Sequence, residues 1–264
     1  MPSMFARPVL HRLVFELRYD YGYTYLDRAG ATINDILKGH PGWVNPQVNP
    51  QGGVLRNLDH EMLFNFGSRK LDLSQTQSAK IAELAPIEEF ARLAKELTAT
   101  VVEWLELGDF TRMGFRAWRL YEMGSSDEAK KAVIGLGVLS ADLIEKMELG
   151  SASEVSWSAV VETNDVTTRI AVSAIEQNIE VDPATLKAAL DVPHMHDRNQ
   201  KKILADRVKA KRRVANYPQF AVLVDMDHFV QDPPRPEGGS IAEFITSQFQ
   251  WGATASDRII KTRS

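Results

Sequence analysis

Histidine and aspartate gather in two short segments of this 264-residue sequence. His194 and His196 stand two residues apart, and so do Asp225 and Asp227. Residues two apart in an extended backbone project to the same side, so each segment could offer two ligands to one ion. Imidazole and carboxylate ligands suit zinc or manganese, which can activate a water molecule for hydrolysis. The pattern therefore allows a metal-dependent hydrolase or nuclease.

The same two segments have a simpler interpretation. Nothing in the sequence shows that they meet, and a short motif without structural context matches by chance. A histidine can cap a loop, and aspartates near the end of a strand are commonly solvated. We therefore favour no metal ligand and no cofactor, and we keep the hydrolase as an alternative.

Other signatures of catalysis are missing from the sequence. It contains no cysteine, which excludes disulfides, thiolate zinc sites and thiol nucleophiles. It also has no Gly-x-Ser-x-Gly elbow, no P-loop and no glycine fingerprint for a dinucleotide. We name no catalytic residue and lean towards a protein that is not an enzyme.

A third cluster is made of basic residues. Between Arg198 and Arg213 stand eight Lys or Arg and one acid, Asp206, whereas the whole chain has a net charge of −4. If this segment is a helix, six cations fall within one arc of about 120°. They are Arg198, Lys201, Lys202, Lys209, Arg212 and Arg213. Such a face can meet phosphates or an acidic protein surface, and a merely solvated face is the alternative.

The elements that must position these residues predict an α+β fold, with mixed or antiparallel sheets packed against helices. Alternating apolar and polar residues predict strands, and apolar residues three or four apart predict helices. We expect strands at 13–19, 54–58, 62–66, 70–73, 110–122, 155–161, 166–175 and 220–229. We expect helices at 26–38, 126–134, 141–149, 182–190 and 198–214, a long central helix at 81–107, and a last helix from Ser240 that Gly252 ends or interrupts. The proline-rich segment 43–53 is expected to be an exposed loop.

A glycine-containing join between the predicted helices 126–134 and 141–149 suggests a boundary near Gly150. We expect two α+β halves, 1–150 and 151–264, and one composite domain is the alternative. Hydrophobic residues make up 44% and charged residues 25%, so the chain can bury a sizeable core. Charges interrupt the apolar stretches near the N-terminus, which predicts a cytoplasmic protein without a membrane contact.

Four segments together resemble one family. They are Pro8-Val9 leading into the strand 13–18, the run Arg112-Met113-Gly114-Phe115-Arg116, the strand 222–229, and the last helix with Phe244, Phe249 and Ile259. In this order they resemble a sporadically distributed family of uncharacterised prokaryotic proteins of about this length, and the resemblance covers nearly the whole chain. This sequence departs from the family after Arg116, where Ala117-Trp118 stands in place of the polar end expected for that strand. The resemblance implies a two-part α+β fold, no established activity, and members scattered among genomes like mobile or defence-linked genes.

From these observations we expect a non-enzymatic interaction or regulatory subunit of a bacterial defence or stress system. It would contact a protein partner or nucleic acid through the basic helix, as a homo-oligomer or as a subunit of a complex. A homo-oligomeric scaffold joined through its sheets is a further alternative.

Overall fold

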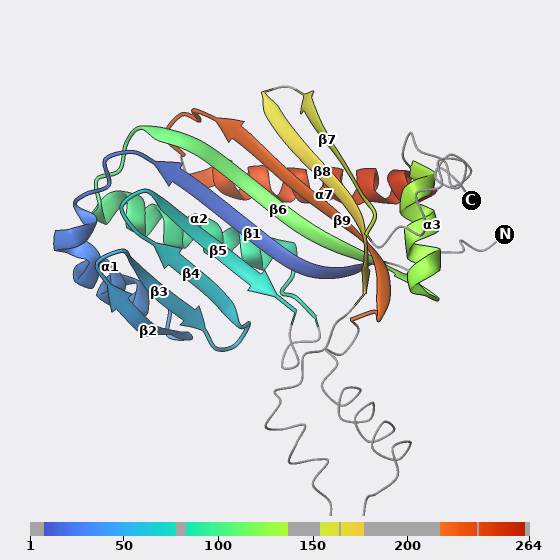
Figure 1. The fold of residues 1–264 in the computed structure, drawn as a ribbon. Helices are drawn as coiled ribbons and strands as arrows, with labels where there is room; N and C mark the ends of the chain where they lie inside the picture. The colour runs from blue at the N-terminus through green and yellow to red at the C-terminus, as the bar shows by residue number, and fades with distance from the viewer. Residues whose placement is uncertain are drawn as a thin grey trace, which may run out of the picture.

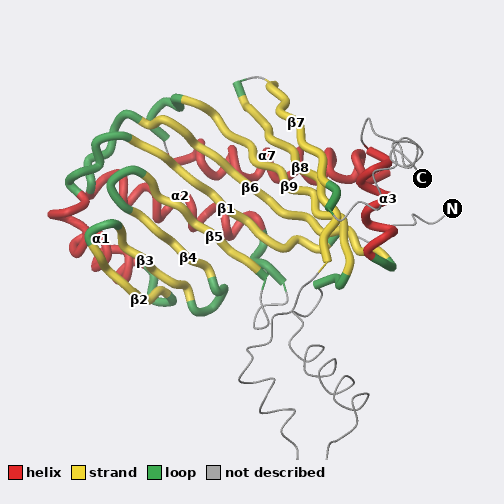
Figure 2. Tube along the Cα trace, viewed as in Figure 1, coloured by secondary structure: helices red, strands yellow, loops and turns green. Residues whose placement is uncertain are grey.

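The computed structural model describes residues 8–77, 83–136, 154–163, 165–176, 217–236 and 238–261. They form one large antiparallel sheet with helices over one of its faces (Figures 1 and 2). The protein is therefore α+β, and more of its described residues lie in strands than in helices. None of the described helices combines the length and the apolar character that crossing a membrane requires.

The sheet has nine strands in the order β2-β3-β4-β5-β1-β6-β9-β8-β7. The strands are β1 Val9–Tyr19, β2 Trp43–Asn49, β3 Gly52–Asn57, β4 Met62–Phe66, β5 Lys70–Thr76, β6 Phe110–Met123, β7 Ser156–Thr163, β8 Val166–Glu176 and β9 Phe220–Gln231. The described helices are α1 Tyr25–Gly39, α2 Ile87–Trp104, α3 Ser126–Leu136 and α7 Gly238–Lys261. These bounds confirm the expected strands, the β7–β8 hairpin and the helices near 26–38 and 126–134.

The two faces of the sheet differ because of the alternation in its strands. In β1, Leu13, Phe15 and Leu17 are completely buried, while Glu16 and Arg18 point to the opposite face. The buried side packs against α2 and α7 in the main hydrophobic core. Each fully buried Leu or Phe side chain contributes about 1.5–3 kcal/mol to folding. The four described helices lie over this apolar face (Figure 1), and the other face carries many charged side chains.

The strands of the two expected halves belong to one sheet. Strand β6 pairs with β9 over its length, from Arg112 opposite Gln231 to Met123 opposite Phe220. Helix α7 likewise packs against α2 and shares its core. The strands of the two expected α+β halves therefore share one sheet, because β9 continues the sheet that β6 begins. The boundary proposed at Gly150 lies outside the described residues.

The expected long central helix is also shorter than its apolar stripe suggests. Helix α2 begins at Ile87, six residues later than expected, because Pro86 has the extended conformation of a residue before a helix, with ψ at 144°. A proline also disfavours helical geometry in the residue before it. Among the described helices the longest is α7, with 24 residues against 18 for α2.

The segment expected to be a loop, 43–53, forms most of a hairpin. Its residues supply β2 and the beginning of β3, and the two residues after Asn49 make the turn between them. The Asn49 side-chain oxygen accepts hydrogen bonds from the backbone N–H groups of Gln51 and Gly52, at 2.9 and 3.0 Å. A register shift between Val44 and Gln47 accommodates Pro46, because prolines in strands are confined to bulges and edges.

Helix α7 does not end at Gly252 but continues through it to Lys261. A Cβ atom at this position would lie 3.1 Å from Nε2 of His228 and 3.3 Å from a guanidinium nitrogen of Arg119. The glycine therefore allows the helix to approach the sheet closely, and it is not a stop signal. The helices predicted at 141–149, 182–190 and 198–214 lie outside the described residues.

Candidate functional site

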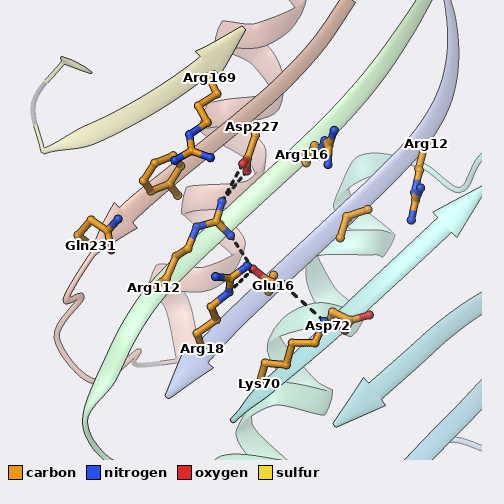
Figure 3. Close-up of a pocket in the computed structure, with 13 residues that line it drawn as sticks. Arg12, Glu16, Arg18, Lys70, Asp72, Arg112, Arg116, Arg169, Asp227 and Gln231 are labelled. Carbon is orange, nitrogen blue, oxygen red and sulfur yellow. Dashed lines mark hydrogen bonds and ion pairs between the residues drawn. The ribbon is translucent and has the colours of Figure 1, made fainter. Parts of the chain in front are cut away.

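The open face of the sheet is hollowed into a depression of about 380 Å³ that spans strands β5, β1, β6, β9 and β8 (Figure 3). Charged side chains dominate its lining. Six are cations, namely Arg12, Arg18, Lys70, Arg112, Arg116 and Arg169, and three are carboxylates, namely Glu16, Asp72 and Asp227. Cations thus outnumber carboxylates by three, although the chain as a whole is acidic.

Strand register brings these residues together. Val14 of β1 stands opposite Arg116 of β6, which stands opposite Asp227 of β9, which stands opposite Arg169 of β8. Residues two apart in each strand share this face, so neighbouring rows add further charged side chains. The site therefore depends on the pairing of four strands that are far apart in the sequence.

Arg112 is at the centre of the depression. Its Nη1 donates a hydrogen bond of 2.6 Å to Glu16, and its Nη2 donates to both carboxylate oxygens of Asp227 at 2.8 Å. The Arg112 side chain is only 14% exposed, so these charge-assisted bonds are shielded from water. A Cβ atom at Gly114 would lie 2.8 Å from Nη1, so the glycine makes room for the guanidinium to lie across the strand.

Glu16 joins the two sides of this network. Its Oε1 also accepts a hydrogen bond from Nε of Arg18 at 2.8 Å. The ammonium of Lys70 lies 3.7 Å from Oε2 of Glu16 and 3.3 Å from Asp72, and Asp72 accepts a further hydrogen bond from Asn65. Within the described part of the chain, Oε2 of Glu16 therefore has an ion-pair neighbour but accepts no hydrogen bond.

Four arginines of the depression lie over aromatic rings. The guanidinium groups of Arg112 and Arg169 lie 4.5 and 5.3 Å from the centre of the Phe229 ring. Arg12 and Arg116 lie at 5.0 and 5.4 Å from the Trp118 ring. Cation–π attraction at such distances contributes about 0.5–1 kcal/mol at an exposed site. Four of the guanidinium groups that line the depression thus lie over an aromatic ring.

Arg116 is paired, whereas two other arginines are not. Two hydrogen bonds join Arg116 to Asp225, one of them from Nε at 2.8 Å, and they raise the pKa of the guanidinium above its ordinary value. By contrast, Arg12 and Arg169 have no described carboxylate within ion-pair distance, and aromatic rings are their partners. Nε of Arg12 is moreover buried without a hydrogen-bond acceptor. Two of the six cations thus have capacity for an anion that the described chain does not supply.

The aspartates that the sequence suggested as metal ligands are both engaged by arginines. Asp225 and Asp227 lie on one face of β9, as expected from their spacing, but Arg116 binds the first and Arg112 binds the second. Their proposed partners His194 and His196 lie outside the described residues. In the part of the chain that is described, no three His, Asp or Glu side chains gather as they would around a metal ion. The six cations proposed on the basic helix, between Arg198 and Arg213, also lie outside the described residues.

Sequence reasoning missed the residues that form the depression, namely Arg12, Glu16, Arg112 and Arg169. A signal was present, because Arg12, Glu16 and Arg18 share one side of the strand 13–19 and its extension, and Arg112 and Arg116 share one side of the strand 110–122. What the sequence did not reveal was which strands pair. Three of the segments that carry the family resemblance, in β1, β6 and β9, meet at this depression (Figure 3).

A second polar pair, His228 and Arg119, lies on the covered face, between the sheet and α7. His228 is completely buried, and its Nδ1 lies 2.9 Å from the hydroxyl of Thr168. Burial, reinforced by the neighbouring charge of Arg119, lowers the pKa of His228 to about 4. Arg119 donates a hydrogen bond to the Phe249 carbonyl, and burial lowers its pKa to about 10. Gly252 of α7 packs closely against His228 and Arg119, which fits a structural role for this pair.

The chain has no match among models of known protein families, and no curated protein is significantly similar to it. The candidate site is thus defined by its geometry, as an electropositive depression with two arginines free to bind an anion.

Proposed function

We propose that this protein is a non-enzymatic binding subunit that holds an anionic group of a partner molecule in the charged depression. The observation that carries the proposal is the pair of arginines, Arg12 and Arg169, that lack carboxylate partners in a network where cations are in excess. The buried Nε of Arg12 lacks an acceptor, which is costly, and an incoming anion removes that cost, while the exposed Arg169 is accessible to the same anion.

The ion pairs around these two arginines support binding by preorganisation. Arg112 is held by Glu16 and Asp227, and Arg116 is held by Asp225, so these neighbours of Arg12 and Arg169 are fixed before a ligand arrives. A fixed cation loses little side-chain entropy on binding, which favours affinity. The competing interpretation is a structural charge ladder, in which the charged side chains of neighbouring strands only stabilise the sheet. It predicts no ligand.

The basic segment 198–213 fits the same proposal as a second point of contact. The segment belongs to the connection between β8 and β9, whose ends Glu176 and Phe220 stand opposite each other in the sheet. Its excess of seven positive charges would extend the electropositive surface towards a nucleic acid or an acidic protein. We keep it as a proposal beside the depression, testable by reversing Lys209, Arg212 and Arg213 to Glu.

The test measures binding of the full chain to inorganic pyrophosphate, a short single-stranded RNA and a polyaspartate peptide. We expect at least one probe to bind, with an affinity that falls as salt is added. The double variant Arg12→Gln and Arg169→Gln should lower that affinity at least about tenfold, as the loss of charged hydrogen bonds implies.

A matched control comes from the helical side of the protein. Arg92 of α2 is half-exposed, and its ion-pair partners among the described residues are Glu89 and Glu96, so Arg92→Gln removes one positive charge away from the depression. It should leave the affinity within about twofold, since its charge is screened at that distance. If the control and the double variant weaken binding equally, or if neither these probes nor a phosphate ester binds the native chain, the depression is a structural charge ladder.

A further inference from the structure

We infer that the anionic ligand of the depression also carries hydroxyl groups, and that it belongs to the phosphorylated polyols, the class that includes sugar phosphates and nucleotides. This inference rests on the proposed function, because it concerns the same depression. The inference adds the hydroxyl groups of the ligand. They are expected to bind the carboxylates that lie among the arginines.

The lining offers acceptors as well as donors. Glu16 lines the depression, and its Oε2 has the Lys70 ammonium at 3.7 Å but takes no hydrogen bond from a described residue, although Oε1 of the same carboxylate takes two. A carboxylate oxygen is a hydrogen-bond acceptor only, so the group that completes it must be a donor. A ligand hydroxyl provides such a donor without adding charge.

The donors for the anionic part lie on the other side of Arg112. Arg169 reaches towards Asp227 and the Phe229 ring, and its guanidinium makes no hydrogen bond to a described residue (Figure 3). The planar fork of a guanidinium matches two oxygens of a phosphate. A phosphate at Arg169 and a hydroxyl at Glu16 would lie on opposite sides of Arg112, whose two ends are already bound to Glu16 and Asp227.

The mixture of charges argues against a ligand that is anionic throughout. Glu16, Asp72 and Asp227 lie among the cations, and a uniform polyanion would place negative charge beside each of them. Repulsion between like charges weakens such a complex, most of all where water is excluded. A ligand that presents phosphate to arginine and hydroxyl to carboxylate avoids this cost. The depression of about 380 Å³ also falls in the range of small-molecule sites.

The experiment compares three probes on the full chain by isothermal titration calorimetry. The probes are inorganic phosphate, propyl phosphate and ribose 5-phosphate, of which only the last combines a phosphate monoester with several hydroxyl groups. We expect ribose 5-phosphate to bind at least about tenfold more tightly than propyl phosphate, the gain of one hydrogen bond to a charged group.

The variant Glu16→Gln separates the two halves of the ligand. It keeps the size of the side chain but weakens the acceptor, so the ratio of the affinities for ribose 5-phosphate and propyl phosphate should fall from at least about tenfold to within about twofold, whatever the change in phosphate affinity itself. If Glu16→Gln weakens both probes equally, Glu16 acts only by holding Arg112, and the inference is overturned. Arg169→Gln should weaken all three probes together.

A further probe identifies the source of the ligand. A mononucleotide and a short RNA with a 5′-phosphate share the required chemistry, so both should show the dependence on Glu16. Equal affinity points to a free metabolite, and tighter binding of the RNA points to an RNA end. Phosphate binding that needs Arg169 but ignores hydroxyl groups would overturn this inference and leave the proposed function intact. Failure of every phosphate probe and of the RNA and peptide probes would remove the proposed function as well.

Discussion

Arginine serves three different purposes in this protein, and the neighbours of each side chain decide which. Arg112 is bound by two carboxylates on the open face. Arg169 lies over the Phe229 ring and makes no hydrogen bond to a described residue. Arg119 is buried under α7, with a backbone carbonyl as its hydrogen-bond partner. The first organises the candidate site, the second is available to a ligand, and the third sets the charge that His228 experiences.

The buried His228 should make the protein sensitive to acid. Its pKa is near 6.5 in the unfolded chain and about 4 in the folded protein, so the unfolded state takes up a proton first as the pH falls. The free energy of unfolding should therefore decrease between about pH 6.5 and pH 4, by at most about 3 kcal/mol from this group. Urea denaturation at a series of pH values measures the slope.

The variant His228→Asn provides the comparison, because an amide can still bond to Thr168 but does not titrate in this range. We expect the variant to be less stable at neutral pH and to lose less stability on acidification. Parallel pH profiles for the variant and the native protein would show that the acid sensitivity originates elsewhere.

At the scale of elements, α1 and α7 show that a glycine in a helix has no single meaning. Gly30 lies inside α1 with no atom within 4 Å of where its Cβ would be. Gly252 lies inside α7 above His228, Arg119 and Met226, whose nearest atoms are 3.1–3.5 Å from such a Cβ. The first is a replaceable helix position, and the second is a point of close approach between helix and sheet.

The two glycines should therefore respond oppositely to alanine. Gly30→Ala should raise the free energy of unfolding by about 1 kcal/mol, because alanine has the higher helix propensity. Gly252→Ala gains the same propensity but crowds the buried pair, so we expect a net loss of about 1–2 kcal/mol. Chemical denaturation of both variants measures the difference, and a gain of stability for Gly252→Ala would contradict the close packing of α7.

The whole molecule is organised by the continuous sheet. One core cluster joins α1, α2 and the start of α7 to β1 and its neighbours, and a second joins α3 and the end of α7 to β8 and β9. Strand β6 and helix α7 contribute to both clusters. Because the clusters share these elements, neither can lose its packing without exposing the other.

We therefore expect a single unfolding transition that responds to changes in either cluster. Leu97→Ala, in the first cluster, should cost about 2–5 kcal/mol, and Val224→Ala, in the second, should cost about 2 kcal/mol. Both should shift the same transition, followed in parallel by circular dichroism and tryptophan fluorescence. Two separable transitions, each moved by one variant, would instead support two independent halves.

Local periodicity was sufficient to predict much of the secondary structure. The alternation in 13–19 identified β1 and its buried side, and the pair 155–161 and 166–175 identified the β7–β8 hairpin. The shared face of Asp225 and Asp227 also followed from their spacing alone. These features succeed because side-chain direction in a strand has a period of two, whatever the strand packs against.

The candidate site was decided by tertiary structure. Arg112 and Asp227 stand 115 residues apart, and Arg112 and Glu16 stand 96 apart, so no local pattern links them. They meet because β6 pairs with β1 on one side and with β9 on the other. The sequence by itself determined which side chains share a face of each strand. Only the order and register of the strands placed the arginines around a common depression, since non-local pairing depends on the packing of the whole sheet.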